Sequence, residues 1–163
     1  MTKIFSLTKL KAIGIALVAI VSFSACEKMP PFGDGKGPRT SFHTIASDKK
    51  FNLLTAAVVK AGLAQKINKK KASFTLFAPT DDAFRAAGFK DIKDITNVPE
   101  ATLKAILLYH VLGSEIKSTQ IPQAANTEVN TVANKPVYVT RTASNKVFVN
   151  GIAVIIKDID CTN

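Results

Sequence analysis

The 163-residue sequence contains no tryptophan and only two residues each of cysteine, histidine, methionine and tyrosine. The two cysteines, Cys26 and Cys161, stand far apart and are too few for a disulfide framework, so we predict that both are unpaired. No second histidine, cysteine or carboxylate cluster stands at metal-ligand spacing from His110, so we predict no metal site. Ten phenylalanines and a hydrophobic content of 47% still supply one apolar core.

The motifs of common enzyme classes are also missing. No serine lies in a glycine-flanked nucleophile motif, and the three glycines of residues 33–37 precede a proline rather than a helix, so they form no phosphate-binding loop. Asp81 and Asp82 are adjacent and point to different sides of a predicted helix start, which does not suit acid–base work with His110. We therefore predict a protein that is not an enzyme, with no catalytic residue and no cofactor.

Acidic residues are scarce relative to basic ones. Lysine and arginine number 22 against 12 aspartates and glutamates, a formal charge of +10. Lys3, Lys9 and Lys11 fall in a segment that we expect to be removed, which leaves 19 basic residues and a charge of +7. Such an excess favours association with anionic polymers or surfaces.

Four lysines gather in one predicted loop, residues 65–71. They are Lys66, Lys69, Lys70 and Lys71. The loop is either a solvated connection or a docking patch for anionic polysaccharide or lipid headgroups. Because no aromatic residues are interleaved with these lysines, we predict no nucleic-acid partner.

The N-terminal segment has the organisation of an export signal. Residues 1–11 carry three lysines and no acid, and Ala12–Val21 is an uncharged apolar run, too short for the ~20 residues of a membrane span. Ser24 and Ala25 directly before Cys26 resemble a bacterial lipobox. That resemblance implies a lipoprotein signal peptide over 1–25 and a membrane anchor on Cys26. The alternative is an ordinary secretory signal with a coincidental cysteine.

A flexible tether is predicted for residues 26–40. Three prolines and three glycines among residues 27–39 prevent any regular element. The full reach of such a tether is on the order of 40 Å. We therefore expect a bacterial cell-envelope protein whose domain, residues 41–163, stands off a periplasmic or outward-facing lipid surface.

Residues 74–84 predict a strand that passes directly into a helix. Phe74, Leu76 and Ala78 alternate with their neighbours as in a buried strand. Pro79 ends the ladder, and Thr80 can cap the following helix, whose first turn carries Asp81 and Asp82. The pattern places Ala83, Phe84 and Ala87 on one helical face and favours a left-handed stop at Gly88.

Two further core helices are predicted on either side of this stretch. The first begins near Ser47 or Asp48 and ends at Gly62, and we expect its apolar stripe to pack on the sheet; the stripe is Phe51, Leu54, Val58 and Ala61. A polar connection, Phe89–Val98, leads to the second helix, which begins at Pro99. Its apolar side is formed by Leu103, Ile106, Leu107 and Val111.

The last third of the sequence predicts strands. Glu128–Thr142 alternates, with Pro136 at an edge or break, and Ala143–Asn145 predicts a hairpin turn. Asn150-Gly151 is the strongest two-residue turn signal in the chain. The apolar run Ile152–Ile156 predicts a buried strand.

Residues 75–84, Thr-Leu-Phe-Ala-Pro-Thr-Asp-Asp-Ala-Phe, resemble the first signature segment of fasciclin (FAS1) domains, and Tyr109-His110-Val111 resembles the tyrosine–histidine segment downstream. The resemblance covers Ser41–Asn163. It implies an α+β fold with helices packed on a small, mostly antiparallel β-sheet wedge. The family closes with an Asn-Gly turn and one more hydrophobic strand, and this sequence stops at Asn163 where that turn begins. We therefore expect a domain that is incomplete at its C-terminus.

The resemblance also implies function. It suggests an adhesion or interaction module that binds polysaccharide or a surface protein, with Tyr109, His110, Asp158 and Ile159 as contact residues. The residues themselves allow structural readings, in which His110 is buried and bonded to backbone and the Asp-Ile pair caps a strand end. A carrier of a small hydrophobic ligand and a structural envelope protein without a ligand are the alternatives. An enclosed apolar cavity favours the carrier, and a filled core with an exposed groove or basic face favours adhesion.

Overall fold

The computed structural model describes residues 39–162. The predicted signal peptide, the lipidation of Cys26 and all but the last two residues of the tether lie outside the described residues. The helices come first in the chain: α1 (Ser41–Ser47), α2 (Asn52–Lys60), α3 (Ala64–Ile67), α4 (Asp81–Ala86), α5 (Ile92–Asn97) and α6 (Glu100–Tyr109), with 3₁₀ turns η1 (Lys49–Phe51) and η2 (Ser118–Gln120). None of these helices is long and apolar enough to cross a bilayer.

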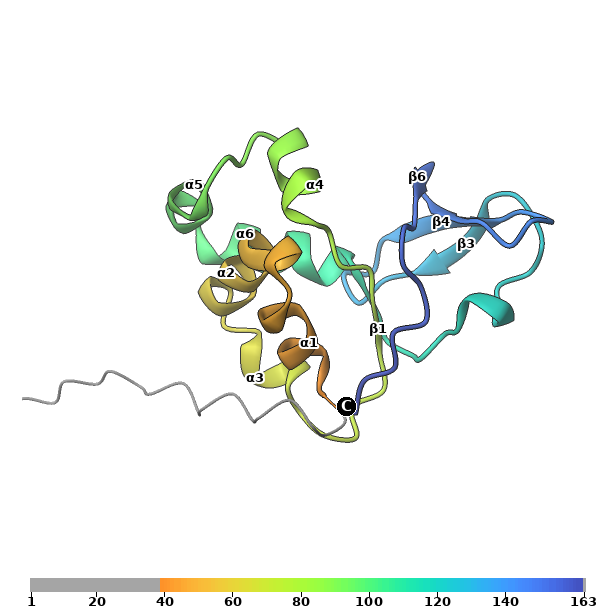
Figure 1. The fold of residues 1–163 in the computed structure, drawn as a ribbon, viewed down its shortest axis with the longest axis horizontal. Helices are drawn as coiled ribbons and strands as arrows, with labels where there is room; N and C mark the ends of the chain where they lie inside the picture. Colours follow the sequence, from red (N-terminus) through yellow and green to blue (C-terminus); the bar gives the residue numbers. More distant parts are fainter. Residues whose placement is uncertain (1–38, 163) are drawn as a thin grey trace, which may run out of the picture. The chain divides into compact units, whose positions relative to one another are not determined.

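The strands form two antiparallel sheets. They are β1 (Thr75–Leu76), β2 (Val111–Leu112), β3 (Thr127–Asn130), β4 (Pro136–Arg141), β5 (Val147–Val149) and β6 (Ile152–Ala153). One sheet pairs β1 with β2, and the other runs in the order β3-β4-β5-β6. Figure 1 shows the helices at one side, the four-stranded sheet at the other and β1 running between them. The α+β arrangement agrees with the predicted fold class.

The segment around β1 separates two apolar clusters. Phe74, Leu76 and Ala78 pack against the buried residues of the helices, whereas Phe77 packs against those of the sheet. Alternation along an extended chain sends successive side chains to opposite sides, which explains the two-sided contact; the sequence had predicted only a buried strand. The paired strand is shorter than predicted, only two residues, and these are half-buried.

The strand-to-helix transition is confirmed in its geometry. The Thr80 hydroxyl oxygen accepts a hydrogen bond from the Ala83 amide (3.4 Å), and α4 begins at the next residue, Asp81. Gly88 has φ +97°, the left-handed conformation that ends a helix. The predicted apolar face is wrong in part: Phe84 is buried, but Ala83 and Ala87 are exposed because α4 is a single short helix at the molecular edge.

The helical core is built around α2. Leu54, Val58 and Ala61 are at most 3% exposed, as their spacing predicted, and Gly62 has φ +65° at the helix end. This stripe packs mainly against other helices, and it meets the sheet region through β1 rather than through the four-stranded sheet. The predicted packing on the sheet is corrected accordingly.

A fifth helix replaces the polar connection predicted at Phe89–Val98. The Asp91 carboxylate accepts from the Asp94 amide (3.0 Å), and the Asp94 carboxylate accepts from the Asp91 amide in return. This reciprocal cap starts α5 and lets Ile95, 0% exposed, enter the core. The paired aspartates were the available signal for this helix.

Helix α6 begins one residue later than predicted, with Pro99 as its N-cap. Leu103 and Leu107 are buried, but Ile106 is 39% exposed because it lies on the outer side of the helix. Val111 belongs to β2, where it pairs with Leu76.

The four-stranded sheet follows its predicted turns. Pro136 is the first residue of β4, where a missing N–H is tolerated. Asn150 and Gly151 both have positive φ, 48° and 81°, as a tight β5–β6 hairpin requires. The prediction of a buried strand at Ile152–Ile156 is wrong: only Ile152–Ala153 pairs, and Ile152, Ile155 and Ile156 are 74%, 84% and 57% exposed.

Candidate functional site

Tyr109 lies at the end of α6, where it ties the helix to the sheet. Its hydroxyl donates to the Pro136 carbonyl oxygen (3.2 Å) and accepts from the Asn150 side-chain amide (3.1 Å). The Asn150 side-chain oxygen in turn accepts from the Tyr138 amide (2.9 Å). A hydroxyl held on two sides positions the hairpin, so Tyr109 has a structural task in addition to its predicted role as a contact residue.

His110 has a structural environment as well. One ring nitrogen, Nδ1, lies 2.8 Å from the Ile106 carbonyl oxygen, and the His110 carbonyl oxygen accepts from the Phe77 amide (2.9 Å). The bonding to backbone agrees with the structural reading, although the residue is half-buried rather than buried. No group of three or more His, Cys, Asp or Glu residues within 39–162 is arranged to hold a metal ion.

Asp158 anchors the C-terminal segment to η2. Its carboxylate accepts from the Ser118 amide (2.7 Å) and from the Ser118 hydroxyl. These bonds lower the pKa of the Asp158 carboxyl; burial opposes them, and Lys157 and Lys117 add smaller effects in the lowering direction. Asp158 has φ +56°, so the backbone turns here and Ile159 is left 53% exposed.

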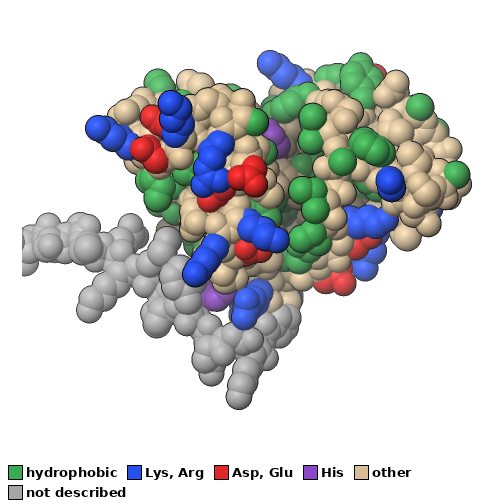
Figure 2. All heavy atoms as spheres, turned by 45° about the horizontal axis from the view of Figure 1, so that its top comes forward, with side chains coloured by type: hydrophobic (Ala, Val, Ile, Leu, Met, Phe, Trp, Pro, Cys, Tyr) green, Lys and Arg blue, Asp and Glu red, His purple; other side chains and the backbone are tan. Residues whose placement is uncertain are grey.

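The two predicted contact pairs stand apart. Tyr109 and His110 bond to the β4 and β5–β6 region and to α6, whereas Asp158 bonds to η2, and no hydrogen bond within residues 39–162 joins the pairs. The exposed isoleucines form what we call the C-terminal isoleucine segment, which consists of Ile152, Ile155, Ile156 and Ile159. In Figure 2, charged side chains of both signs are interspersed on the helical side, and hydrophobic side chains gather toward the sheet.

The lysine cluster, Lys66 with Lys69, Lys70 and Lys71, is fully on the surface. Lys66 lies in α3 rather than in a loop, and the other three follow that helix. None of the four forms an ion pair with another residue of 39–162. Their positive charge is therefore directed to solvent.

Asp81 has a role that the sequence did not reveal. Its side chain is buried, and its carboxylate accepts from the Leu53 amide (2.8 Å) at the start of α2. Asn52 donates to the same carboxylate (3.5 Å), and Arg85 lies 4.0 Å away. Asp81 therefore caps a helix that begins almost thirty residues earlier in the chain, and it is not available as a binding group.

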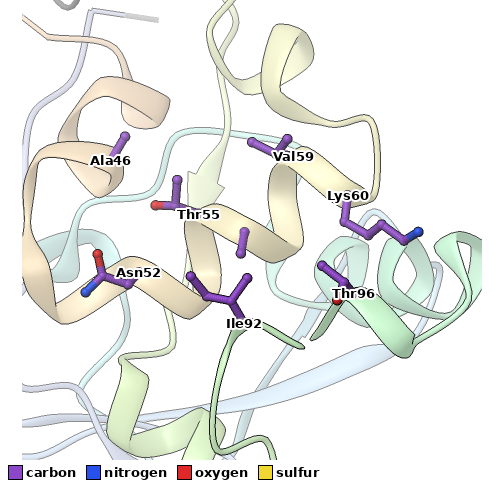
Figure 3. A pocket seen from close by; sticks show the side chains of 8 residues that line it. Ala46, Asn52, Thr55, Val59, Lys60, Ile92 and Thr96 are labelled. Carbon is purple, nitrogen blue, oxygen red and sulfur yellow. The ribbon is translucent and has the colours of Figure 1, made fainter. Parts of the chain in front are cut away.

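A surface groove lies where α1, α2 and α5 meet, and sequence reasoning missed it. It has a volume of about 490 Å³ and is open to solvent; Figure 3 shows its lining: Ala46, Asn52, Thr55, Ala56, Val59, Lys60, Ile92 and Thr96. Val59 and Ile92 are 46% and 52% exposed. The Thr55 hydroxyl is buried and has no hydrogen-bond partner in residues 39–162. Val59 was the available signal, since it is an apolar residue off the buried stripe of α2.

The chain matches known proteins over most of its length. Residues 49–163 match the model of the fasciclin domain. The chain is 30% identical over 156 residues to protein sll1483 of Synechocystis, covering 93% of this chain and 83% of that protein. It is 34% identical over 118 residues to the uncharacterized protein sll1735 of the same organism, covering 72% and 84%.

Two animal proteins are also similar. The pig transforming growth factor-beta-induced protein ig-h3 is 38% identical over 88 residues, which span 53% of this chain and 11% of that protein. The solved FAS1 domain pair from the insect cell adhesion molecule fasciclin I aligns with a TM-score of 0.61 at 17% identity, over 77% of this chain and 47% of that one. This last likeness concerns the fold.

Proposed function

The chain belongs to the fasciclin domain family, and on that premise we propose that it is a lipid-anchored adhesion or interaction module of a bacterial cell envelope. Members of this family are generally adhesion-type modules rather than enzymes. The module binds a surface polysaccharide or protein, needs no cofactor and performs no catalysis. Acyl chains on Cys26 hold it at the membrane.

The observation that carries this proposal is the open groove above a filled core. Leu54 and Ile95, at the centre of the helices, are 0% exposed, which supports a packed helical interior rather than the enclosed cavity that a carrier needs. The volume of about 490 Å³ lies at the surface instead. A filled core with an external apolar groove suits a partner that stays outside the domain.

The groove combines apolar and polar recognition. Val59 and Ile92 supply exposed apolar surface, and such surface on a monomer marks contact sites when it is rimmed by polar residues. Lys60 and Thr96 also line the groove, and they supply a positive charge and a hydroxyl to a partner's polar groups. The fitting partner therefore presents small apolar groups among hydroxyl or acidic groups.

The test is adhesion of beads that carry the protein to whole cells and to isolated envelope polysaccharide. Val59→Asp with Ile92→Asp places two charges in the groove and should weaken adhesion about tenfold. Ile106→Asp with Val132→Asp makes the same charge change at exposed apolar sites outside the groove and should leave adhesion unchanged. Adhesion of the unmodified protein no better than that of an equally charged control protein would identify a structural envelope protein without a ligand.

Asp158 and Ile159 form a second proposed contact, on the C-terminal isoleucine segment. Ile159→Ala should weaken adhesion severalfold through lost apolar contact, and Ile155→Ala, a neighbouring exposed isoleucine, is the matched control. Equal effects of the two substitutions would show that the segment contributes only general hydrophobicity.

The lipid anchor has its own test. Cys26→Ser removes the acylated sulfur, and the protein should leave the membrane fraction and become soluble. Fractionation that does not change would reject lipidation while leaving the adhesion experiment unaffected.

A further inference from the structure

The lysine cluster, Lys66, Lys69, Lys70 and Lys71, is tied to the point where the N-terminal segment enters the domain. The Thr40 hydroxyl donates to the side-chain oxygen of Asn68, which stands in the middle of the cluster (2.5 Å). Helix α3, which carries Lys66, packs against α1. The cluster therefore lies beside the first described residues of the chain.

The C-terminal end lies at the same place. The Thr162 amide donates to the Arg39 carbonyl oxygen (2.9 Å), and the Cys161 sulfur lies 3.5 Å from the Thr44 hydroxyl. Figure 1 shows α3, the start of α1 and the C-terminal end together at one end of the domain, with α4 and α5 at the opposite end. Both ends of the domain thus leave from one surface, which we call the tether surface.

The residues of this region carry almost only positive charge. Residues 39–74 contain eight lysines and arginines and a single acidic residue, Asp48. The Asp48 carboxylate accepts from the Lys50 amide within η1, so it is engaged at a helix start. The lysine cluster itself has no acidic partner among the described residues.

We propose that the tether surface docks on the membrane, with Lys66, Lys69, Lys70 and Lys71 contacting anionic lipid headgroups. The inference rests on the proposed acylation of Cys26. Cys26 precedes Arg39 by thirteen residues, a maximum reach on the order of 40 Å. The acyl anchor confines the lysines near headgroups, so even weak contacts become intramolecular and are strongly populated.

The position of the lysine cluster on the tether surface favours lipid headgroups over polysaccharide as its anionic partner. A polysaccharide partner could meet lysines anywhere on the domain, whereas the anchored chain brings the side from which it leaves closest to the lipid surface. Each lysine close to an anionic membrane contributes roughly a fivefold gain in binding.

Docking also fixes the orientation of the domain. With the tether surface on lipid, the end that carries α4 and α5 points away from the membrane, and with it the α5 side of the groove at Ile92 and Thr96. The groove is then presented to partners outside the membrane. Docking thus leaves the α5 side of the groove open to a partner.

The experiment uses acylated full-length protein, purified in detergent and reconstituted into vesicles of phosphatidylcholine alone or of equal parts phosphatidylcholine and phosphatidylglycerol. A water-soluble amine-acylating reagent is applied, and the modification rate of each lysine is read by mass spectrometry. In the anionic vesicles the four cluster lysines should be modified about fivefold more slowly than in neutral ones. At about 1 M salt, where the screening length is about 3 Å, the protection should vanish.

Four exposed lysines outside the tether surface are internal controls and should be modified equally in both vesicles: Lys93, Lys104, Lys135 and Lys146. Glutamine at Lys70 and Lys71 should reduce the protection of the remaining cluster lysines, Lys66 and Lys69, in the anionic vesicles, and glutamine at the four control positions should leave the protection of the cluster unchanged. If the protein is anchored but the four cluster lysines are modified equally fast in both kinds of vesicle, the inference is overturned. Equal protection by a soluble anionic polysaccharide in neutral vesicles also overturns it. Protein that does not incorporate into vesicles contradicts the proposed acylation instead.

Discussion

The helical region and the sheet region differ in how many of their hydrophobic residues are buried. The helical cluster contains thirteen buried hydrophobic residues, whereas the sheet cluster contains four, Leu112, Val137, Val139 and Val147. The outer side of the sheet and the chain that follows it leave Tyr138 44% and Ile155 84% exposed. Most of the free energy of unfolding should therefore come from the helices, and the sheet depends on its links to them.

These links are few and specific. Phe77 packs on the sheet cluster from the segment whose other side chains pack on the helices. Tyr109, at the end of α6, bonds to Pro136 and Asn150 of the sheet region. Hydrogen bonds of the Tyr109 side chain thus help to position the small sheet core against the helices.

The largest difference should appear when each core is truncated. Leu54→Ala, at a 0% exposed site of the helical cluster, should lower the free energy of unfolding by about 3 kcal/mol, and Val139→Ala in the sheet cluster by about 2 kcal/mol. Urea unfolding measures both. Val59→Ala, on the surface of α2, is the control and should cost under about 0.5 kcal/mol. A larger cost for Val139→Ala than for Leu54→Ala would reverse the ranking of the two cores.

Within the helical region, loss of the buried Asp81 carboxylate should have the next largest effect on the free energy of unfolding. Asp81→Ala leaves the Leu53 amide without its acceptor and should lower the free energy of unfolding by about 2 kcal/mol. Asp82→Ala changes the same charge at an exposed neighbour and should cost much less. Equal thermal shifts for the two variants would contradict the capping of α2 by Asp81.

The link between the two regions is tested by Tyr109→Phe. The substitution removes the hydroxyl bonded to Pro136 and Asn150 and should cost about 1 kcal/mol. Amide hydrogen exchange should rise around β4 and the β5–β6 turn and stay unchanged in α2. Tyr138→Phe, at an exposed tyrosine, is the matched control. Uniform loss of protection in both regions would show that they unfold as one unit.

The smallest effect concerns pH at the edge of the sheet region. Because the Ser118 bonds lower the pKa of Asp158 in the folded state, the ionised carboxylate stabilises the fold above about pH 4. This contribution is lost as pH falls through the lowered value. Ser118→Ala should make the urea midpoint less dependent on pH in this acidic range, and Ser114→Ala, an exposed serine, should not. If the urea midpoint depended on pH identically in the unmodified protein and in Ser118→Ala, the hydrogen bonds from Ser118 to Asp158 would not stabilise the C-terminal segment.

The sequence predicted the features that depend on a few neighbouring residues. The Thr80 cap, the left-handed stops at Gly62 and Gly88 and the Asn150-Gly151 turn are confirmed. Predictions of burial were less reliable, because they require knowledge of which other element packs on the residues. Ile152–Ile156 has the composition of a buried strand, but burial depends on a covering element, and none of the described residues covers it.

The candidate sites show the same division. The lysine cluster was proposed from local charge and the Asp158–Ile159 pair from the family resemblance, and both stay predictions. The groove was missed because its walls come from α1, α2 and α5, and only their packing brings Val59 and Ile92 to one place. The attachment of Asn68 to Thr40 was equally unpredictable, since it joins residues far apart in the chain.

The sequence by itself determined where the backbone turns, which residues start and end the helices and to which family the chain is similar. Backbone conformation is set by side chains within about one helical turn, so a local pattern suffices. The tertiary structure alone decided that Asp81 caps α2, that Asn150 holds Tyr109, and which apolar residues reach solvent. Those outcomes depend on pairs of residues brought together by packing, and a linear pattern carries no record of distance in space.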